Sequence, residues 1–343
     1  MIDPSSSSAE HIEEELSFLR SPSTYPDRPD RVEIVETHFA WVFLSRRFAY
    51  KLNKPVKFHD IDYTSVEKRK KSCESALRLN RRLAPHPYLD CIALTDNSSG
   101  LTLGGSGNPV DWLLRMNRLP NETILETRLM EGNVTNSDLA TLARCLVEFY
   151  MHSPVAPWNG TQYTQALRRS ILRNGEWLSA LPLEFDVSVS DRLVAAQVGF
   201  IGRYTALLEE RADQGHVVDC HGDLRPEHIS LGEHCEIIDC IEFSSALRLL
   251  DSAEELSFLA LECNRLNRPD IAEQLMNTYK LESDDFVDDR LVHFYSSRQA
   301  LNRAMLSAWH LEAPFFADTG SRWIQRANWY LAAGQNRIKA ALE

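Results

Sequence analysis

The feature that most constrains this 343-residue chain is the run H-G-D-L-R-P-E-H at 221–228. A β-branched pair precedes it, and two short apolar runs, 228–231 and 236–238, follow around a glycine-containing turn. Apolar runs separated by turn residues predict a strand, a loop and then a hairpin. The loop would hold the carboxylate of Asp223. The second hairpin strand would bring Asp239 back to the same end of a small sheet.

Two converging aspartates are typical of phosphoryl transfer. One accepts or orients the proton of the attacking hydroxyl, and the other holds magnesium that bridges the nucleotide phosphates. Either residue alone is more often an ordinary turn or strand-end aspartate, because Asp beside Gly is a common turn signal. Together with Gly222 and the hairpin, the pair favours Asp223 as the catalytic residue and Asp239 as a metal ligand.

Further motifs accompany this loop in a fixed order. They are E-T-H-F-A-W-V-F-L at 36–44, A-Y-K-L-N-K-P-V at 49–56, L-R-L-N-R-R-L-A-P at 77–85, L-L-R-M-N-R-L-P at 113–120, V-V-D-C-H-G-D-L-R-P-E-H-I-S-L at 217–231, I-I-D-C-I-E-F at 237–243 and A-L-R-L-L-D at 246–251. With these motifs the chain resembles the aminoglycoside phosphotransferase family enzymes, a bacterial small-molecule kinase branch of the protein-kinase-like fold. The resemblance runs from about residue 31 to at least residue 258, and more loosely to the C-terminus.

The resemblance implies an α+β, two-lobed protein-kinase-like fold with an antiparallel β-sheet N-lobe and a mainly helical C-lobe. It also implies an ATP- or GTP-dependent phosphotransferase that acts on a hydroxyl group of a small molecule, with Mg²⁺ or Mn²⁺ as cofactor. The acceptor is not identified by these motifs, because a fold hosts many functions. No G-x-x-x-x-G-K-[ST] motif occurs, so we expect no fused P-loop kinase domain of the kind that some members carry.

Three segments near the N-terminus, 32–36, 41–44 and 48–52, are rich in β-branched and aromatic residues and predict three strands. The third strand carries Lys51. In kinase-like enzymes a lysine on the third strand neutralises nucleotide phosphates, so Lys51 is the candidate for this role and Lys54 is its competitor. A solvated strand lysine is the commoner fate of this residue type.

The acidic partner of that lysine is expected on the next helix. The segment 64–83 is strongly charged with apolar residues along one face, which predicts an exposed helix packed on one side. The resemblance then implies Glu74 as the partner of Lys51. Ala76 stands where family members often have a second acidic residue, so the identity of the partner stays open.

Four further residues are candidates for nucleotide contacts. Thr37 and His38 lie in the expected phosphate-covering loop, which lacks glycine and so approaches phosphates less closely. Arg115 and Met116 lie in the segment 113–120, which is expected to leave the first lobe as a hinge and to contact the adenine edge through backbone groups.

His228 departs from the kinase pattern. Kinase-like loops place an asparagine five residues after the catalytic aspartate to bind a second magnesium ion, and this chain has His228 there. Magnesium prefers oxygen ligands, so an imidazole is a poor substitute. Three outcomes follow: an enzyme with one metal ion, an enzyme that uses manganese through His228, or a nucleotide-binding pseudokinase without turnover.

The amino-acid composition of the chain excludes some classes of binding partner. The formal net charge of −12 and the pI near 5.4 argue against nucleic acid and anionic membranes as partners, because both reward an excess of Lys and Arg. No apolar run approaches membrane-spanning length, and the N-terminus has neither a basic start nor an apolar signal core. We therefore expect a cytoplasmic protein whose partner is a small-molecule hydroxyl acceptor.

The seven cysteines show no C-x-x-C spacing, which favours reduced thiols over a disulfide framework. A structural zinc protein is a less favoured alternative, because no familiar zinc spacing occurs. The residues that suggest it lie within one short stretch: His216, Cys220, His221, His228, His234, Cys235 and Cys240. For His221 we expect a hydrogen-bonded scaffold of the catalytic loop rather than a proton carrier.

We divide the chain into an N-terminal appendage (1–30), a nucleotide-binding N-lobe (31–116) and a helical C-lobe (117–343). Asp251 has the spacing of an N-cap box with Glu254, and we class it as structural support.

Two features of the C-lobe bear on the acceptor. The acidic segment 282–289 would attract a cationic acceptor, but it more often marks a solvated helix start. Arg298, Arg303 and Trp309 on the following helix are candidates for lining the acceptor cleft, and ordinary surface or core positions are the alternative.

Overall fold

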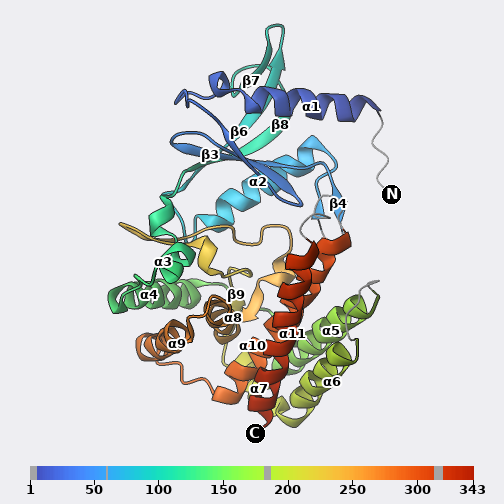
Figure 1. Cartoon of the computed structure of the whole chain (residues 1–343), viewed down its shortest axis with the longest axis vertical. Coiled ribbons are helices and arrows are strands. Elements are labelled where there is room, and N and C mark those ends of the chain that lie inside the picture. The colour runs from blue at the N-terminus through green and yellow to red at the C-terminus, as the bar shows by residue number, and fades with distance from the viewer. Residues whose placement is uncertain (1–5, 59–60, 181–186, 313–319) are drawn as a thin grey trace. The chain divides into compact units, whose positions relative to one another are not determined.

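The protein has the predicted α+β architecture, and its computed structural model divides into two compact units (Figure 1). Unit 1 comprises Met1–Thr127 and Glu227–Ser245, and unit 2 comprises Arg128–Pro226 and Ala246–Glu343. The residues that the structure describes are 6–58, 61–180, 187–312 and 320–343. Unit 1 contains an antiparallel sheet, whereas unit 2 is mainly helical.

Unit 1 is built on a six-stranded sheet in the order β1-β2-β3-β8-β6-β7, in which all neighbours are antiparallel. The strands are β1 (Glu33–Glu36), β2 (Ala40–Leu44), β3 (Phe48–Asn53), β6 (Tyr88–Asn97), β7 (Gly100–Leu103) and β8 (Asn108–Asn117). The first three lie within two residues of the predicted strands. Because β3 pairs with both β2 and β8, Lys51 occupies a central strand, opposite Val42 and Leu114.

The predicted charged helix is α2 (Val66–Asn80), which is shorter than expected at both ends. Ser65 caps its N-terminus and accepts a hydrogen bond from the backbone N–H of Lys68 (3.3 Å). Its buried face includes Cys73 and Ala76, which pack in a small core with residues of β6 and β8. Helix α2 is therefore held against the sheet by one apolar face, as its sequence pattern predicted.

The N-terminal segment is integrated into unit 1, whereas the sequence predicted a separate appendage. After α1 (Ser6–Arg20), the chain turns back, and Leu16, Leu19 and Tyr25 join a buried core with residues of the sheet. The ring centroids of Tyr25 and Tyr50 lie 5.0 Å apart. The serine- and proline-rich composition of the segment concealed these few apolar anchors, which are enough to fix it to the sheet.

A buried carboxyl group on α1 predicts how stability depends on pH. Glu15 is 5% exposed, and burial together with the neighbouring Asp111 raises its pKa from a usual value of 4.5 to about 8. The folded protein thus holds a proton that the unfolded chain has released, so the free energy of unfolding should fall as pH rises from 4.5 to 8. Glu15→Gln should remove this contribution and make the slope shallower. Urea unfolding at pH 5, 6, 7 and 8 checks this, and an unchanged slope would contradict it.

The predicted hairpin after the H-G-D-L-R-P-E-H run at 221–228 is formed by β10 (Ile229–Leu231) and β11 (Cys235–Ile237). It belongs to unit 1, where the backbone N–H of Ile237 donates to the carbonyl of Leu83 (3.1 Å). The units therefore divide differently from the predicted boundary at residue 116. Strand β8 continues to Asn117, and the hairpin adds a distant stretch of sequence to the sheet unit.

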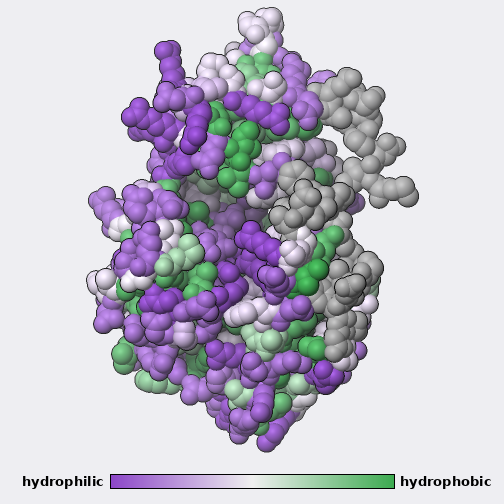
Figure 2. All heavy atoms as spheres, in the orientation of Figure 1, coloured by the Kyte–Doolittle hydropathy of each residue, from purple (hydrophilic) through white to green (hydrophobic). Residues whose placement is uncertain are grey.

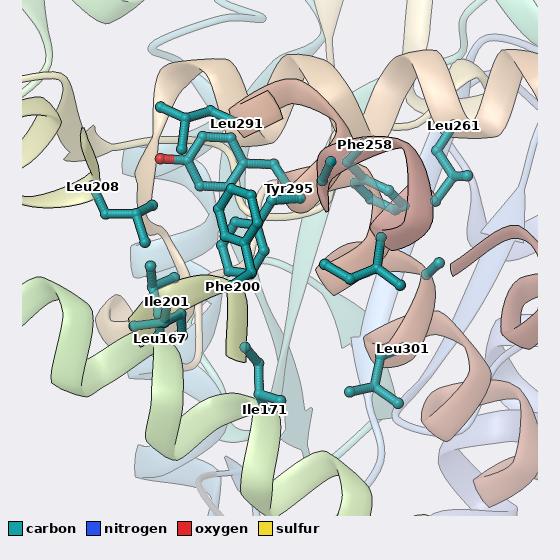
Figure 3. Packing of buried hydrophobic residues seen from close by; sticks show 14 of the residues in the cluster. Leu167, Ile171, Phe200, Ile201, Leu208, Phe258, Leu261, Leu291, Tyr295 and Leu301 are labelled. Carbon is teal, nitrogen blue, oxygen red and sulfur yellow. The ribbon is translucent and has the colours of Figure 1, made fainter. Parts of the chain in front are cut away.

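Unit 2 contains α4 (Asn136–His152), α5 (Gly160–Ala180), α6 (Val187–Arg203), α7 (Thr205–Asp213), α8 (Ser252–Arg265), α9 (Pro269–Ser283), α10 (Asp289–Trp309) and α11 (Gly320–Leu342). Figure 3 shows its core, in which Phe200 and Tyr295 lie close together, flanked by leucine and isoleucine side chains. Phe200 also stacks on Phe294, with ring centroids 4.5 Å apart. Helix α10 packs against both α8 and α11.

Asp251 is structural, as predicted. It is fully buried, and its side chain caps α8 by accepting a hydrogen bond from the N–H of Ala253 (2.9 Å). It also accepts hydrogen bonds from Arg211 (2.8 and 2.7 Å) and from the hydroxyl of Tyr295 (2.8 Å). The predicted capping box is wrong, because the carboxylate of Glu254 pairs with Arg298 instead.

On the face drawn in Figure 2, hydrophilic residues cover most of unit 2, and hydrophobic residues form small separate patches. Within the described ranges, none of the helices is long and apolar enough to cross a membrane. Nor do the described side chains include three His, Cys, Asp or Glu groups arranged to hold a metal ion, so the zinc alternative finds no support there.

Candidate functional site

The central feature of unit 1 is an ion pair between Lys51 and Asp239. The Nζ of Lys51 lies 3.0 Å from Oδ1 of Asp239 and 3.9 Å from Oε1 of Glu242. Burial alone would lower the pKa of Lys51, but the two carboxylates outweigh it and raise that pKa well above its usual value. Lys51 is therefore a permanent cation held at Asp239, and its phosphate-neutralising role stays a prediction.

Asp239 adopts a backbone conformation that is uncommon for a residue with a side chain. Its φ of +63° lies in the left-handed region. Its N–H donates to the hydroxyl of Tyr88 (3.0 Å), and the next N–H, of Cys240, donates to the side chain of Asn80 (2.8 Å). These two contacts hold the strained turn. The side chain of Asp239 remains 50% exposed and can accept further ligands.

The predicted partnership of Lys51 and Glu74 is not found among the described residues. Glu74 is 55% exposed and lies 3.9 Å from Lys70, one helical turn earlier. Glu242 takes the position near Lys51 and is held by a hydrogen bond from the hydroxyl of Tyr63 (3.3 Å). The only sequence signal for Glu242 was its place in the I-I-D-C-I-E-F motif. A nucleotide-binding role for Glu74 stays a prediction.

Lys54, the competitor of Lys51, forms an ion pair with Glu36 on β1 (2.6 Å) and lies over the ring of Trp41. It therefore ties β1 to the end of β3. The predicted phosphate-covering loop is a tight turn, in which Thr37 and Ala40 exchange backbone and side-chain hydrogen bonds of 2.9 to 3.0 Å. Thr37 and His38 stay candidate phosphate contacts.

Arg115 and Met116 lie on β8 rather than in a connecting segment. The guanidinium of Arg115 donates to both carboxylate oxygens of Asp90 (2.9 and 2.6 Å) on the adjacent strand β6. Met116 pairs in register with Ala49 and Tyr88 and packs in the core under α2. The strand continues to Asn117, so the expected hinge begins later than predicted, and the nucleotide contacts proposed for both residues stay predictions.

His228 is buried, at 7% exposure, at the start of the hairpin. Its Nε2 lies 3.7 Å from Oδ2 of Asp239, so the imidazole and the carboxylate face the same space. The carbonyl of His228 accepts a hydrogen bond from the N–H of Ile238 (2.9 Å), which fixes the distance between the two strands. Position 228 is therefore next to Asp239, and a metal-binding role for His228 stays a prediction.

Asp223 belongs to unit 2 and follows β9 (Val217–Asp219). Its Oδ2 accepts hydrogen bonds from Arg225 (3.0 Å to Nε), and its Oδ1 lies 3.7 Å from Arg303. The backbone N–H of Asp223 donates to Nδ1 of the fully buried His221 (3.3 Å). His221 thus supports the loop, as predicted, with its proton placed on Nε2 because Nδ1 accepts. The expected convergence of Asp223 with Asp239 stays a prediction.

Glu255 is a loop support that sequence reasoning missed. Its buried carboxylate accepts hydrogen bonds from the N–H groups of His221 (3.1 Å) and Gly222 (2.5 Å) and from the hydroxyl of Tyr150 (2.9 Å). Gly222 has a φ of +89°, a conformation that favours glycine. An anionic acceptor for two successive N–H groups holds this turn in place. In the sequence, Glu255 looked like one acidic residue among several at a helix start.

The residues that the sequence predicted near the acceptor lie in different surroundings. Arg298 is buried in hydrogen bonds to Glu254 and Ser170, so it is a core residue. Two aspartates of the acidic segment 282–289 have structural contacts nearby: Asp285 forms an ion pair with Arg211 (2.6 Å), and Asp288 caps α10. Arg303 alone among the predicted arginines lies beside Asp223.

No family model matches this chain. It is 30% identical over 280 residues to Uncharacterized protein Rv2004c of Mycobacterium tuberculosis, and equally so to Uncharacterized protein Mb2027c of Mycobacterium bovis. The matched region covers 80% of this chain but only 54% of each relative, so the chain spans about half the length of these relatives.

Among solved structures, a choline/ethanolamine kinase family protein from Mesorhizobium loti matches with a TM-score of 0.54 and 13% identity. The match covers 95% of this chain and 99% of that protein. It confirms the predicted kinase-like fold, with its antiparallel sheet unit and helical unit, and the likeness to small-molecule kinases at the level of the fold. The chain thus has the fold of a small-molecule kinase.

Proposed function

We propose that this chain is an ATP- or GTP-dependent phosphotransferase that acts on a hydroxyl group of a small molecule and belongs with the aminoglycoside phosphotransferase-like kinases. The observation that carries the proposal is the Lys51–Asp239 ion pair of 3.0 Å, which joins residues 188 positions apart. In kinase-like enzymes a lysine on the third strand and an aspartate that binds magnesium both act on the phosphates of a nucleoside triphosphate, and the ion pair brings two such groups together. The shared fold with a choline/ethanolamine kinase family protein supports the same activity.

The residues around Asp239 fit a divalent metal ion that arrives with its nucleotide. Magnesium is commonly bound through one or two carboxylates, with phosphate and water oxygens completing its shell. The half-exposed carboxylate of Asp239 supplies such a ligand, and the imidazole of His228 beside it favours one magnesium ion over two. When bound, the metal would neutralise charge on the nucleotide phosphates. Lys51 would neutralise a further phosphate, and Asp223 would accept the proton of the acceptor hydroxyl.

Nucleotide turnover tests the proposal. Purified chain with ATP or GTP and Mg²⁺ or Mn²⁺ should release nucleoside diphosphate slowly, and faster when a hydroxyl acceptor is present. Asp239→Ala should remove metal-dependent nucleotide binding, measured by thermal shift with and without metal. If the unsubstituted chain binds no nucleotide either with or without metal, both the enzyme and a nucleotide-binding pseudokinase are excluded.

His228 supports a second candidate function, a nucleotide-binding pseudokinase without turnover. The imidazole stands 3.7 Å from Asp239, where a kinase-like loop would present an oxygen ligand. If the chain is an active kinase, His228→Asn should raise magnesium-dependent turnover, because it supplies an oxygen beside Asp239. Initial rates in Mg²⁺ and in Mn²⁺ measure the effect, and the gain should be larger in Mg²⁺ than in Mn²⁺, which accepts imidazole more readily.

A variant that binds nucleotide but stays inactive distinguishes the two functions. If both the unsubstituted chain and His228→Asn bind nucleotide and neither turns it over with a broad acceptor panel, the pseudokinase function is the correct one.

A further inference from the structure

Two arginines of unit 2, Arg303 beside Asp223 and Arg326 beside Glu262, have hydrogen-bond donors without a partner among the described residues. The Nε atoms of Arg303 and Arg326 are buried, and neither has a hydrogen-bond partner within the described ranges. Among the described residues, their terminal nitrogens form ion pairs of 3.7 Å with Asp223 and 3.9 Å with Glu262. Buried donors without partners are costly, so most of them are satisfied in folded proteins. The two donors lie on neighbouring helices, α10 and α11, so the described part of the chain leaves hydrogen-bonding capacity of two guanidinium groups unused in one region.

Aromatic rings surround the two guanidinium groups. The Cζ of Arg303 lies 5.9 Å from the ring centroid of Phe258, and the Cζ of Arg326 lies 5.8 Å from that of Trp323. His310 stacks on Trp323 with centroids 3.9 Å apart. Burial lowers the pKa of His310, and Arg303, Arg326 and Arg225 lower it further, so it adds no charge at neutral pH. Rings of this kind hold the arginines in place and reduce the local dielectric constant, which strengthens their attraction for an anion.

The carboxylates nearby do not neutralise the cations. Glu262 is fully buried and already accepts hydrogen bonds from Arg265 (2.8 Å) and from the hydroxyl of Tyr330. Asp223 is engaged by Arg225. Each carboxylate is thus shared between two arginines, and because these four guanidinium groups face two carboxylates, the cluster carries a net positive charge.

We propose that Arg303 and Arg326 form an anion-binding subsite for the phosphoryl acceptor, so that the acceptor is a small hydroxy compound carrying an oxyanion, either a carboxylate or a phosphate. The inference rests on the proposed phosphotransferase function. Guanidinium groups bind both oxyanions through paired N–H donors. The 3.7 Å contact between Arg303 and Asp223 places the subsite next to the group that would receive the hydroxyl proton. A cationic acceptor would meet these arginines as like charges.

The binding test uses inorganic phosphate without nucleotide, measured by calorimetry. Arg303→Gln and Arg326→Gln should each weaken phosphate binding about tenfold or more, because each removes a charged donor. Arg322→Gln is the matched control, since Arg322 is exposed and stacks on the same Trp323 one turn before Arg326. Lys51→Gln tests whether phosphate binds in the nucleotide half instead. Loss of binding in Lys51→Gln alone would overturn the subsite.

The activity test uses ATP, Mg²⁺ and acceptors that share a hydroxyl skeleton but differ in charge: gluconate, glucose 6-phosphate, glucose and glucosamine. An acidic member should stimulate ADP release most, and comparison of gluconate with glucose 6-phosphate identifies the oxyanion. Arg303→Gln and Arg326→Gln should raise the KM for that acceptor about tenfold or more and leave the KM for ATP unchanged. Preference for glucose or glucosamine would overturn the inference, as would an effect confined to ATP.

The two proposals fail in different ways. If the chain turns over an acceptor but all variants bind phosphate equally, the subsite is overturned and the phosphotransferase function is supported. Phosphate binding that depends on both arginines, without turnover of any acceptor, supports an anion site at the two arginines but overturns the phosphotransferase and the acceptor role of the site. Thermal unfolding checks each variant, and Arg303→Lys or Arg326→Lys replaces a glutamine variant that does not fold. These lysine variants keep the charge but lose the paired donors, so they should bind phosphate more weakly than arginine does.

Discussion

Replacing Asp223 by asparagine is expected to lower the kcat of phosphoryl transfer by about 10²- to 10⁴-fold, the usual contribution of a positioned general base. Asparagine keeps the shape of the side chain and an oxygen that Arg225 can donate to, but it cannot take up the hydroxyl proton. The affinity for nucleotide should remain, because Lys51 and Asp239, not Asp223, are the proposed nucleotide and metal contacts. Steady-state release of nucleoside diphosphate and calorimetric nucleotide binding give the two measurements.

Asp219→Asn is the matched control for this experiment. Asp219 lies on β9 four residues before Asp223 and forms an ion pair with Arg248 (2.6 Å). The same chemical change there should alter stability slightly and leave kcat within a few-fold of the unsubstituted chain. Equal losses of kcat in both variants would mean that Asp223 supports the loop and does no proton chemistry.

The local elements of unit 1 were predictable because their signals lie within a few residues. Strands β1 to β3 follow β-branched and aromatic runs, and the hairpin β10–β11 follows two short apolar segments around a glycine turn. Lys51 was placed on the correct strand for the same reason. The periodicity of apolar residues and the presence of turn-forming residues can both be read from neighbouring positions, so one sequence suffices to identify them.

The partners of these residues were less predictable, because they come from distant parts of the chain. Glu242 lies near Lys51 across 191 residues, whereas Glu74 was expected from its place on the next helix. Tyr88 and Asn80, which hold the strained turn at Asp239, likewise carry no local signal. A contact across such a separation depends on tertiary packing, which residue spacing alone does not encode.

Arg298 and Arg303 illustrate the same limit on one helix. The sequence made both arginines candidates for the acceptor cleft, but five residues turn a helix through about 500°, so their side chains point about 140° apart. Arg298 meets the buried Glu254, and Arg303 meets Asp223. Helical periodicity requires only that the two side chains point in different directions, and the packing of α8 against α10 decides which of them meets Glu254.

Arg298→Met should therefore lower the free energy of unfolding by about 3–5 kcal/mol, the usual cost of removing one partner from a buried ion pair. Methionine fills a similar volume but leaves the fully buried carboxylate of Glu254 with a hydrogen bond from Gln299 (2.7 Å) and no opposing charge. Burial already raises the pKa of Glu254, and losing Arg298 should raise it further. The variant should then hold a proton that the unfolded chain releases, so its loss of stability should be smaller at pH 5 than at pH 8.

Urea unfolding at both pH values measures this effect, and acceptor kinetics separate it from a role in the cleft. Arg322→Met, an exposed arginine on α11, is the control and should change stability by less than about 0.5 kcal/mol. For the folded fraction of Arg298→Met, the KM for acceptor should stay unchanged, because Glu254 and Ser170 occupy its guanidinium. A raised KM at unchanged stability would instead move Arg298 into the acceptor site beside Arg303.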